Sequence, residues 1–252
     1  MAKTLVVGDI HLKAYDILPK VDEILESDEN ISRVVFLGDM CDEWNSDDGC
    51  MMRELEEFAD WVEARRADGL VVDVLLGNHD FQYLLGQPGP GTHDALYGFV
   101  KSVLLPLNPR MACEVDGFLL THAGLTQAYA DEHLSDPEDA ADAADQLNEL
   151  LDDGTLEAFE TLAQCGIGRG GDEIPGPLWA DKWELEEDPI AGIPQIVGHT
   201  PVTTACPGEG ARLEDAPKLW FCDTFSLMSN MVPIGDGSMV VVDNGCVRVV
   251  RP

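Results

Sequence analysis

Basic residues are scarce in this sequence. Its 252 residues include only 15 Lys and Arg against 48 Asp and Glu, which gives a formal net charge of −33. Residues 111–168 contain no Lys or Arg, although they carry 14 Asp and Glu. DNA and RNA binding requires a basic surface. The composition therefore argues against a nucleic-acid partner, and an anionic substrate would have to be attracted by bound cations.

Long apolar runs and paired cysteine motifs are also missing. The longest apolar runs, such as residues 70–76, have the length of a strand, whereas a membrane helix needs about 18 residues. The first apolar run stops at Gly8 and is too short for the core of a secretory signal. Seven scattered cysteines without a CxxC motif are typical of reduced thiols. These absences predict a cytoplasmic protein without a membrane partner.

Enough apolar residues are present to form a core. Hydrophobic residues make up 45% of the chain and charged residues 25%, which argues against disorder. The length favours one large domain, residues 1–252. The excess of acid also fits adaptation to a salt-loving host, because high net charge maintains solubility. The oligomeric state is left open.

Hydrophobic patterns alternate between strand and helix in the first third of the chain, and strand patterns return after residue 192. This alternation predicts the α/β class, with a sheet that is parallel at its centre. The expected strands are 4–7, 33–37, 71–76, 111–115, 118–121, 193–197, 218–222, 239–242 and 246–250, and the expected helices are 17–27, 51–67 and 94–105.

An acidic segment interrupts the strand pattern. Residues 125–165 predict two or three short helices with breaks at Pro137 and Gly154, and a Gly/Pro-rich loop follows. We interpret residues 125–192 as a helical insertion that packs over the strand ends and belongs to the same domain.

Polar residues follow the predicted strands where the strands end, often directly after a glycine. In open α/β sheets this edge is where binding sites form. Each residue alone also fits a turn aspartate or a core histidine, but together they form a set of nitrogen and oxygen donors without thiolate. Such a set suits Mn, Fe, Zn or Ni, and six ligands suggest two ions that share a carboxylate. The residues are Asp9, His11, Asp39, Asn78, His122 and His199.

These residues lie in sequence blocks that resemble the calcineurin-like metallophosphoesterases. The resemblance covers nearly the whole chain in the order of the family's blocks, and it implies that family's four-layer α/β/β/α sandwich. The blocks are Asp9-x-His11, Gly38-Asp39, Gly77-Asn78-His79-Asp80, His122 and Gly198-His199.

The resemblance also implies two divalent metal ions, with Mn expected and Fe, Zn or Ni as alternatives. Asp39 would bridge the ions, and a hydroxide that bridges them would attack phosphorus. Two divalent ions leave a net positive charge at the centre after both carboxylates and the hydroxide are counted. The other implied ligands are Asp9 and His11 for one ion, and Asn78, His122 and His199 for the second.

Two further residues receive catalytic roles from the resemblance. His79 is expected to be the general acid at the leaving group, and a structural histidine is the alternative. Asp42 matches the position of an aspartate that orients this histidine in the Ser/Thr phosphatase branch. A solvated acidic loop explains Asp42 equally well, because Asp47 and Asp48 lie close by.

The last block narrows the branch of the family. Gly198-His199-Thr200 lacks the second histidine of the Gly-His-x-His ending that many phosphodiesterases carry. The ending resembles bacterial and phage Ser/Thr phosphatases and symmetrical diadenosine tetraphosphate hydrolases. This favours a phosphomonoester or a nucleotide over a phosphodiester.

One position departs from the Ser/Thr phosphatase pattern. Glu43 stands where that branch has an arginine that grips phosphate. We expect Arg169 to bind the substrate instead, with a plain surface arginine as the alternative, and Lys182 and Lys13 are weaker candidates for the same role.

The predicted function is a metal-dependent phosphoesterase that hydrolyses a phosphomonoester, either a phosphoprotein or a small phosphate ester. The alternatives are a nucleotide phosphoanhydride hydrolase of the diadenosine polyphosphate type and a non-catalytic metal-binding scaffold. Asp223 is a candidate acceptor for a ligand histidine, or a turn residue. Trp179 and Trp183 have helical spacing and could stack a nucleobase, or simply pack.

Overall fold

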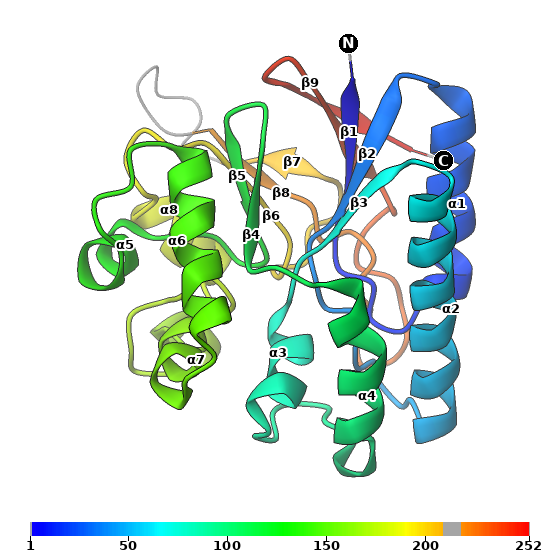
Figure 1. Ribbon diagram of the computed structural model, residues 1–252, viewed down its shortest axis with the longest axis horizontal. Helices are drawn as coiled ribbons and strands as arrows, with labels where there is room; N and C mark the ends of the chain where they lie inside the picture. The colour runs from blue at the N-terminus through cyan, green and yellow to red at the C-terminus, as the bar shows by residue number, and fades with distance from the viewer. Residues whose placement is uncertain (1, 209–217, 252) are drawn as a thin grey trace.

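Two five-stranded sheets form the centre of the molecule (Figure 1). The computed structural model describes residues 2–208 and 218–251. In the first sheet the three strands from the N-terminal part of the chain pair in parallel at one side, and the last two strands of the chain extend the sheet at the other side through antiparallel pairs. In spatial order this sheet contains β10 (Cys246–Val250), β9 (Met239–Asp243), β1 (Lys3–Val7), β2 (Ile31–Phe36) and β3 (Val71–Val74).

The second sheet also has a parallel centre, with an antiparallel strand at each edge. In spatial order it contains β4 (Ala112–Val115), β5 (Phe118–Thr121), β6 (Gln195–Val197), β8 (Leu219–Phe221) and β7 (Cys206–Pro207).

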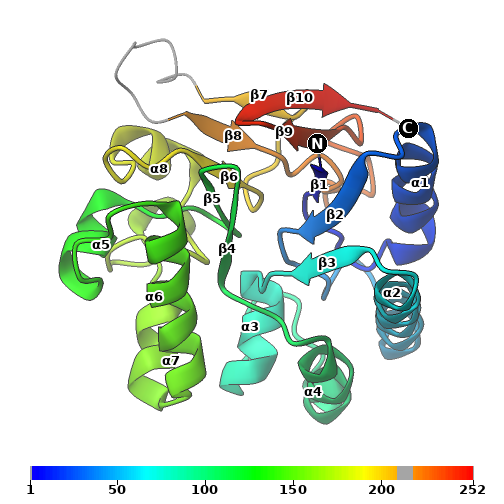
Figure 2. The ribbon, with the colours of Figure 1, turned by 45° about the horizontal axis from the view of Figure 1, so that its top comes forward.

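Helices cover both outer faces of the paired sheets. Figure 2 shows α1 and α2 beside the first sheet and α5, α6 and α7 on the opposite side of the molecule. The three 3₁₀ turns are η1 (Asp94–Leu96), η2 (Leu105–Leu107) and η3 (Ile167–Arg169). The helices are α1 (Ala14–Ser27), α2 (Asp48–Ala67), α3 (Asn78–Leu85), α4 (Tyr97–Leu104), α5 (Gln127–His133), α6 (Ala140–Asp153), α7 (Leu156–Leu162) and α8 (Lys182–Glu187).

Alternation along the strands produces these layers. In β1, Leu5 and Val7 belong to the core shared with α1 and α2, whereas Val6 belongs to the core between the two sheets. In β5, Leu119 faces the helices of the insertion, and Leu120 faces the first sheet. Successive side chains of a strand point to opposite faces, so nearly continuous apolar strands serve two cores at once. The expected four-layer α/β/β/α sandwich is confirmed.

The expected strands and long helices are present, with boundaries that shift by a few residues. Three short elements were not expected: α3, α8 and β7. The α3 helix begins at Asn78, inside a motif that reads as a loop. Trp183 lies on α8, but Trp179 lies in the turn before that helix, so the spacing of these two tryptophans is not that of one helix.

The insertion packs against the second sheet through α6. The Asn148 side chain on α6 is 6% exposed, and its Oδ1 accepts hydrogen bonds from the backbone N–H groups of Met111 at 2.9 Å and Ala112 at 3.3 Å. Its Nδ2 donates to the Ala112 carbonyl at 2.9 Å. We propose on these contacts that residues 125–192 belong to a single domain covering residues 1–252.

Replacing Asn148 with Ala should lower the free energy of unfolding by about 3 kcal/mol, because buried backbone groups lose their partners. Urea unfolding should show one transition, followed by both fluorescence and circular dichroism. The matched control is Asp145→Ala, an exposed position on the same helix, which should change stability by less than about 0.5 kcal/mol. Separate transitions for the insertion and the sheets would contradict the single domain.

No helix within residues 2–208 and 218–251 is long and apolar enough to cross a membrane. This agrees with the absence of long apolar runs in the sequence.

Candidate functional site

The ends of parallel strands from both sheets bring the predicted ligands together. Asp9, Asp39 and Asn78 follow β1, β2 and β3, while His122 and His199 follow β5 and β6. All five are buried, with exposed fractions of 0 to 7%. The site is therefore shared between the two sheets, at the carboxyl ends of their central strands.

Glycines let the backbone approach these carboxylates. A Cβ atom on Gly77 would lie 2.1 Å from Asp39 Oδ1, and one on Gly198 would lie 2.1 Å from Asp9 Oδ1. In the space this leaves, the His199 N–H donates to the Asp9 carboxylate at 3.0 Å, and the His79 N–H donates to Asp39 Oδ1 at 2.9 Å. The glycine in each block is thus required by packing against a carboxylate.

The orientation of His122 leaves one ring nitrogen available for a cation. Its Nδ1 lies 2.9 Å from the Leu37 carbonyl oxygen, which can only accept, so Nδ1 carries a proton. In the neutral ring the lone pair is then on Nε2. That atom lies 3.0 Å from Asn78 Oδ1, 3.1 Å from His199 Nδ1 and 3.4 Å from Asp39 Oδ2. Oxygen and nitrogen atoms that could bind a cation therefore converge around His122 Nε2.

His11 is oriented in the same way. Its Nδ1 lies 2.9 Å from the Asp42 carbonyl oxygen and 3.3 Å from that of Cys41. Its Nε2 faces two carboxylates, 3.5 Å from Asp39 Oδ2 and 3.8 Å from Asp9 Oδ2. Backbone carbonyls thus fix the tautomers of both histidines, as in many metal sites.

The donor set fits metal ions. Two groups of side chains offer ligand atoms within 4.8 Å of one another, and Asp39 belongs to both. His199 Nε2 is buried without a hydrogen-bond partner among the described residues. Imidazole and carboxylate donors without thiolate suit first-row divalent ions. The groups are His11, Asp39 and His79, and Asp39, His122 and His199.

The charged groups at this point shift one another's pKa values. Burial would raise the pKa of Asp39, but His122 and His79 outweigh it and hold that pKa well below its usual value. Burial would lower the pKa of His122, but Asp39 and Asp9 outweigh it and raise it to about 9. A proton and a metal ion therefore compete for His122 Nε2, and metal affinity should weaken as the pH falls.

Asp223 does not accept a hydrogen bond from a ligand histidine, which corrects that sequence hypothesis. Backbone carbonyls occupy the Nδ1 atoms of His11 and His122, and Asp223 instead accepts from Ser226, at 2.8 Å from its hydroxyl. These hydrogen bonds instead fit the alternative hypothesis, that Asp223 is a turn residue. Burial, followed by the nearby Asp223 carboxylate, raises the pKa of Asp9 well above its usual value.

Asp42 and His79 form a hydrogen-bonded pair beside the ligand cluster. His79 Nδ1 lies 3.0 Å from Asp42 Oδ2, which also accepts a hydrogen bond from Gln82. The Tyr83 hydroxyl donates to Asp42 Oδ1 at 2.6 Å. Gln82 and Tyr83 were missed at the sequence level, because the helix α3 that positions them was not expected.

A cavity of 640 Å³ opens onto the cluster. Asp9 and His122 are fully buried beneath it. The predicted site residues that border the cavity are His11, Asp39, Asp42, Asn78, His79, Arg169 and His199.

Among the described residues that border this cavity, Arg169 is the only Lys or Arg. Its Nη2 donates to Thr200 Oγ1 at 2.7 Å, and its Nε lies 2.9 Å from Asp181 Oδ2. Lys13 instead forms an ion pair with Glu43, and Lys182 pairs with Glu186 at 3.0 Å. Of the three candidate cations, Arg169 alone reaches the cavity wall.

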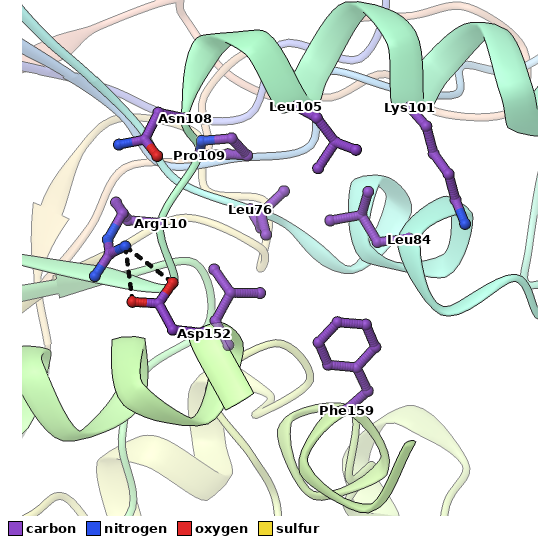
Figure 3. Close-up of a pocket in the computed structure, with 10 residues that line it drawn as sticks. Leu76, Leu84, Lys101, Leu105, Asn108, Pro109, Arg110, Asp152 and Phe159 are labelled. Atoms are coloured by element: carbon purple, nitrogen blue, oxygen red, sulfur yellow. Dashed lines mark hydrogen bonds and ion pairs between the residues drawn. The ribbon is translucent and has the colours of Figure 1, made fainter. Parts of the chain in front are cut away.

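A second cavity of 390 Å³ lies between α4, α3 and the end of α6 (Figure 3). Leu76, Leu84 and Phe159 line it, and an ion pair of 3.2 Å joins Arg110 to Asp152 at its edge. None of the predicted site residues borders it. Every predicted site residue that borders one of these two cavities therefore borders the larger one.

Comparison with known proteins identifies relatives of this arrangement. The model of the calcineurin-like phosphoesterase family matches residues 2–203. A substituted form of a cold-active protein tyrosine phosphatase superposes with a TM-score of 0.62 at 16% identity, over 100% of this chain and 78% of that chain. The cold-active protein tyrosine phosphatase of a psychrophilic Shewanella species superposes with a TM-score of 0.59 at 14% identity, over 100% and 81% of the respective chains. Identities this low show a shared fold alone. No curated protein sequence matches the chain.

Proposed function

Because the chain belongs to the calcineurin-like phosphoesterase family and is a hydrolase, we propose that it is a metal-dependent phosphatase acting on phosphomonoesters. One observation carries this proposal. The donor groups that share Asp39 lie at the floor of an open cavity, and the His79–Asp42 pair and Arg169 border the same space.

We assign the ligands as the sequence blocks imply. Asp39 belongs to both donor groups, which supports a role for its carboxylate as the bridge between two ions. When bound, two divalent ions would activate a water, orient the phosphoryl group and neutralise charge on the leaving oxygen. Mn²⁺ is the proposed ion. The remaining proposed ligands are Asp9 and His11 for one site, and Asn78, His122 and His199 for the other.

The protein's own residues supply binding and proton transfer. The Arg169 guanidinium borders the cavity and is proposed to hold nonbridging phosphate oxygens, the role that Glu43 cannot fill. His79 is proposed to protonate the leaving oxygen through its Nε2, while Asp42 holds Nδ1. Burial would lower the pKa of His79, but Asp39 and Asp42 outweigh it and raise that pKa, so the acid form is favoured.

The scarcity of Lys and Arg among the described residues of the cavity wall also distinguishes the candidate substrates. A dinucleoside tetraphosphate carries several negative charges, and within residues 2–208 and 218–251 Arg169 is the only Lys or Arg that borders the cavity to balance them beside bound metal ions. A monoester dianion needs fewer contacts. This favours the phosphomonoester over the polyphosphate, which remains the second candidate.

Hydrolysis of p-nitrophenyl phosphate and bis-p-nitrophenyl phosphate tests the proposal. Turnover of the monoester should require Mn²⁺, disappear after chelation and exceed turnover of the diester. A faster diester reaction would assign a phosphodiesterase. Bound metal without turnover of either compound would favour the scaffold, or a narrow nucleotide substrate that diadenosine tetraphosphate would reveal.

Replacing Arg169 with Ala should raise KM for p-nitrophenyl phosphate about 10- to 100-fold, the equivalent of one or two charge-assisted hydrogen bonds, with a smaller change in kcat. Lys182→Ala is the matched control, because Lys182 pairs with Glu186 outside the cavity. Initial rates at several substrate concentrations give both constants. Equal effects of the two variants would remove Arg169 from the substrate site.

A further inference from the structure

The active-site cavity has an apolar part that the phosphate does not need. The metal-ligand candidates and Arg169 account for its polar floor. Large apolar side chains from two distant segments, residues 44–46 and 226–234, line another part of the wall. They are Trp44, Leu227 and Ile234.

Trp44 is held in place although it is exposed. Its side chain is 55% exposed, which is unusual for the largest apolar residue. The indole Nε1–H donates to the Leu227 carbonyl at 3.0 Å, and the Trp44 N–H donates to Glu43 Oε1 at 2.7 Å. These contacts fix the ring at the cavity wall before any ligand binds, and a preorganised ring loses little entropy on binding.

The position of Trp44 matches the path of the leaving group. His79, the proposed proton donor to that group, is held by Asp42, which lies two residues before Trp44. His93 also borders the cavity, its ring Nε2 lies 3.1 Å from Ser46 Oγ, and its backbone N–H donates to the hydroxyl of Tyr83, another partner of Asp42. A leaving group that departs past His79 enters a cavity whose wall also includes Trp44.

The apolar surface continues beyond the cavity. The loop that carries Leu227 also carries Met228, Met231 and Val232, which are 49%, 46% and 48% exposed. A backbone hydrogen bond from Met228 to Val232 at 2.9 Å closes this loop. In a protein of charge −33, this loop carries no charged residue between Leu227 and Ile234.

We propose that Trp44, together with Leu227 and Ile234, forms a leaving-group subsite that selects aryl phosphate monoesters over alkyl ones. The inference rests on the phosphomonoesterase function proposed above. In the reaction, water supplies the oxygen of the new P–O bond, and the aryl O–P bond breaks with its electron pair on oxygen. A proton completes the phenol, and inorganic phosphate is the second product. The aromatic ring of the substrate packs against the indole.

Paired substrates separate ring recognition from leaving-group reactivity. Phenyl and 2-naphthyl phosphate release phenols of similar acidity but different ring area, and glycerol 2-phosphate lacks a ring. Trp44→Ala should lower kcat/KM about tenfold for 2-naphthyl phosphate, less for phenyl phosphate, and within about twofold for glycerol 2-phosphate. Trp44→Phe should retain most of the wild-type preference. Trp183→Ala, an exposed tryptophan that does not border the cavity, should match wild type.

Calorimetric binding of benzylphosphonate and methylphosphonate gives a second readout without turnover. Trp44→Ala should weaken benzylphosphonate binding alone. Equal losses on all substrates, or no loss on 2-naphthyl phosphate, would overturn the subsite and leave the phosphatase function intact. If the wild-type protein turned over no monoester, the proposed function would fail first and the subsite with it.

Discussion

Replacing Asp39 with Asn is expected to reduce turnover of p-nitrophenyl phosphate by about a thousandfold or more and to lower the metal content of the protein. Metal-centre chemistry of this kind supplies several kcal/mol of transition-state stabilisation. Asp39 is the only residue that belongs to both donor groups, and its Oδ2 lies 3.5 Å from His11 Nε2 and 3.4 Å from His122 Nε2. Asparagine keeps the shape and the acceptor for the His79 N–H, but it removes the charge.

Metal content measured by mass spectrometry and kcat measured with added Mn²⁺ check this prediction together. Added Mn²⁺ should also raise the melting temperature of the wild-type protein, because a ligand that binds only the folded state stabilises it. This rise should shrink in Asp39→Asn. Asp145→Asn removes a charge at an exposed position on α6 and should behave as wild type. Full activity of Asp39→Asn would exclude the assigned centre.

That the candidate ligands come together could be predicted, because each of them follows a local sequence pattern. A buried strand, a glycine and an acid follow one another at Gly38-Asp39, and parallel strands bring such ends to one edge. The alternation of strands and helices predicted the α/β class with a parallel centre, whereas the four-layer sandwich was implied by the resemblance of the sequence blocks to the family. Gly77 and Gly198 carry a further signal, because each leaves room for the carboxylate of a different block.

The unpredicted parts depend on contacts between distant segments. The α3 helix spans only eight residues, and it buries polar side chains that loops usually carry. Among them, Asp80 accepts hydrogen bonds from the N–H groups of Cys41 and Gly77, both at 3.0 Å, and burial raises its pKa to about 6. Trp44 meets the Leu227 carbonyl across 183 positions of sequence. A local sequence pattern cannot indicate a contact between residues so far apart in the chain.

His79→Ala is expected to lower kcat by about 100- to 10,000-fold on an alkyl phosphate, the usual range for a lost general acid. On p-nitrophenyl phosphate the loss should be much smaller, because nitrophenolate leaves without a proton. The His79 ring stands edge-on to His11, with centroids 5.2 Å apart, and its Nδ1 is engaged by Asp42. That geometry supports a role for His79 as a proton donor beside the proposed metal ligands. Because this role does not require His79 to bind a metal ion, the metal content of His79→Ala should stay near that of the wild-type protein.

The Asp42→Asn substitution tests how Asp42 acts on His79, because it changes the partner of His79 and keeps the His79 side chain. The Asp42 carboxylate contributes to the raised pKa of His79, so its removal should lower that pKa. The acid form of His79 would then be lost at a lower pH, and the alkaline limb of the pH–rate profile for an alkyl phosphate should move to lower pH.

A parallel loss of metal and activity in His79→Ala would instead make His79 a ligand, as its membership of the His11–Asp39 donor group allows. The pH profile and the metal content together therefore decide between an acid and a ligand.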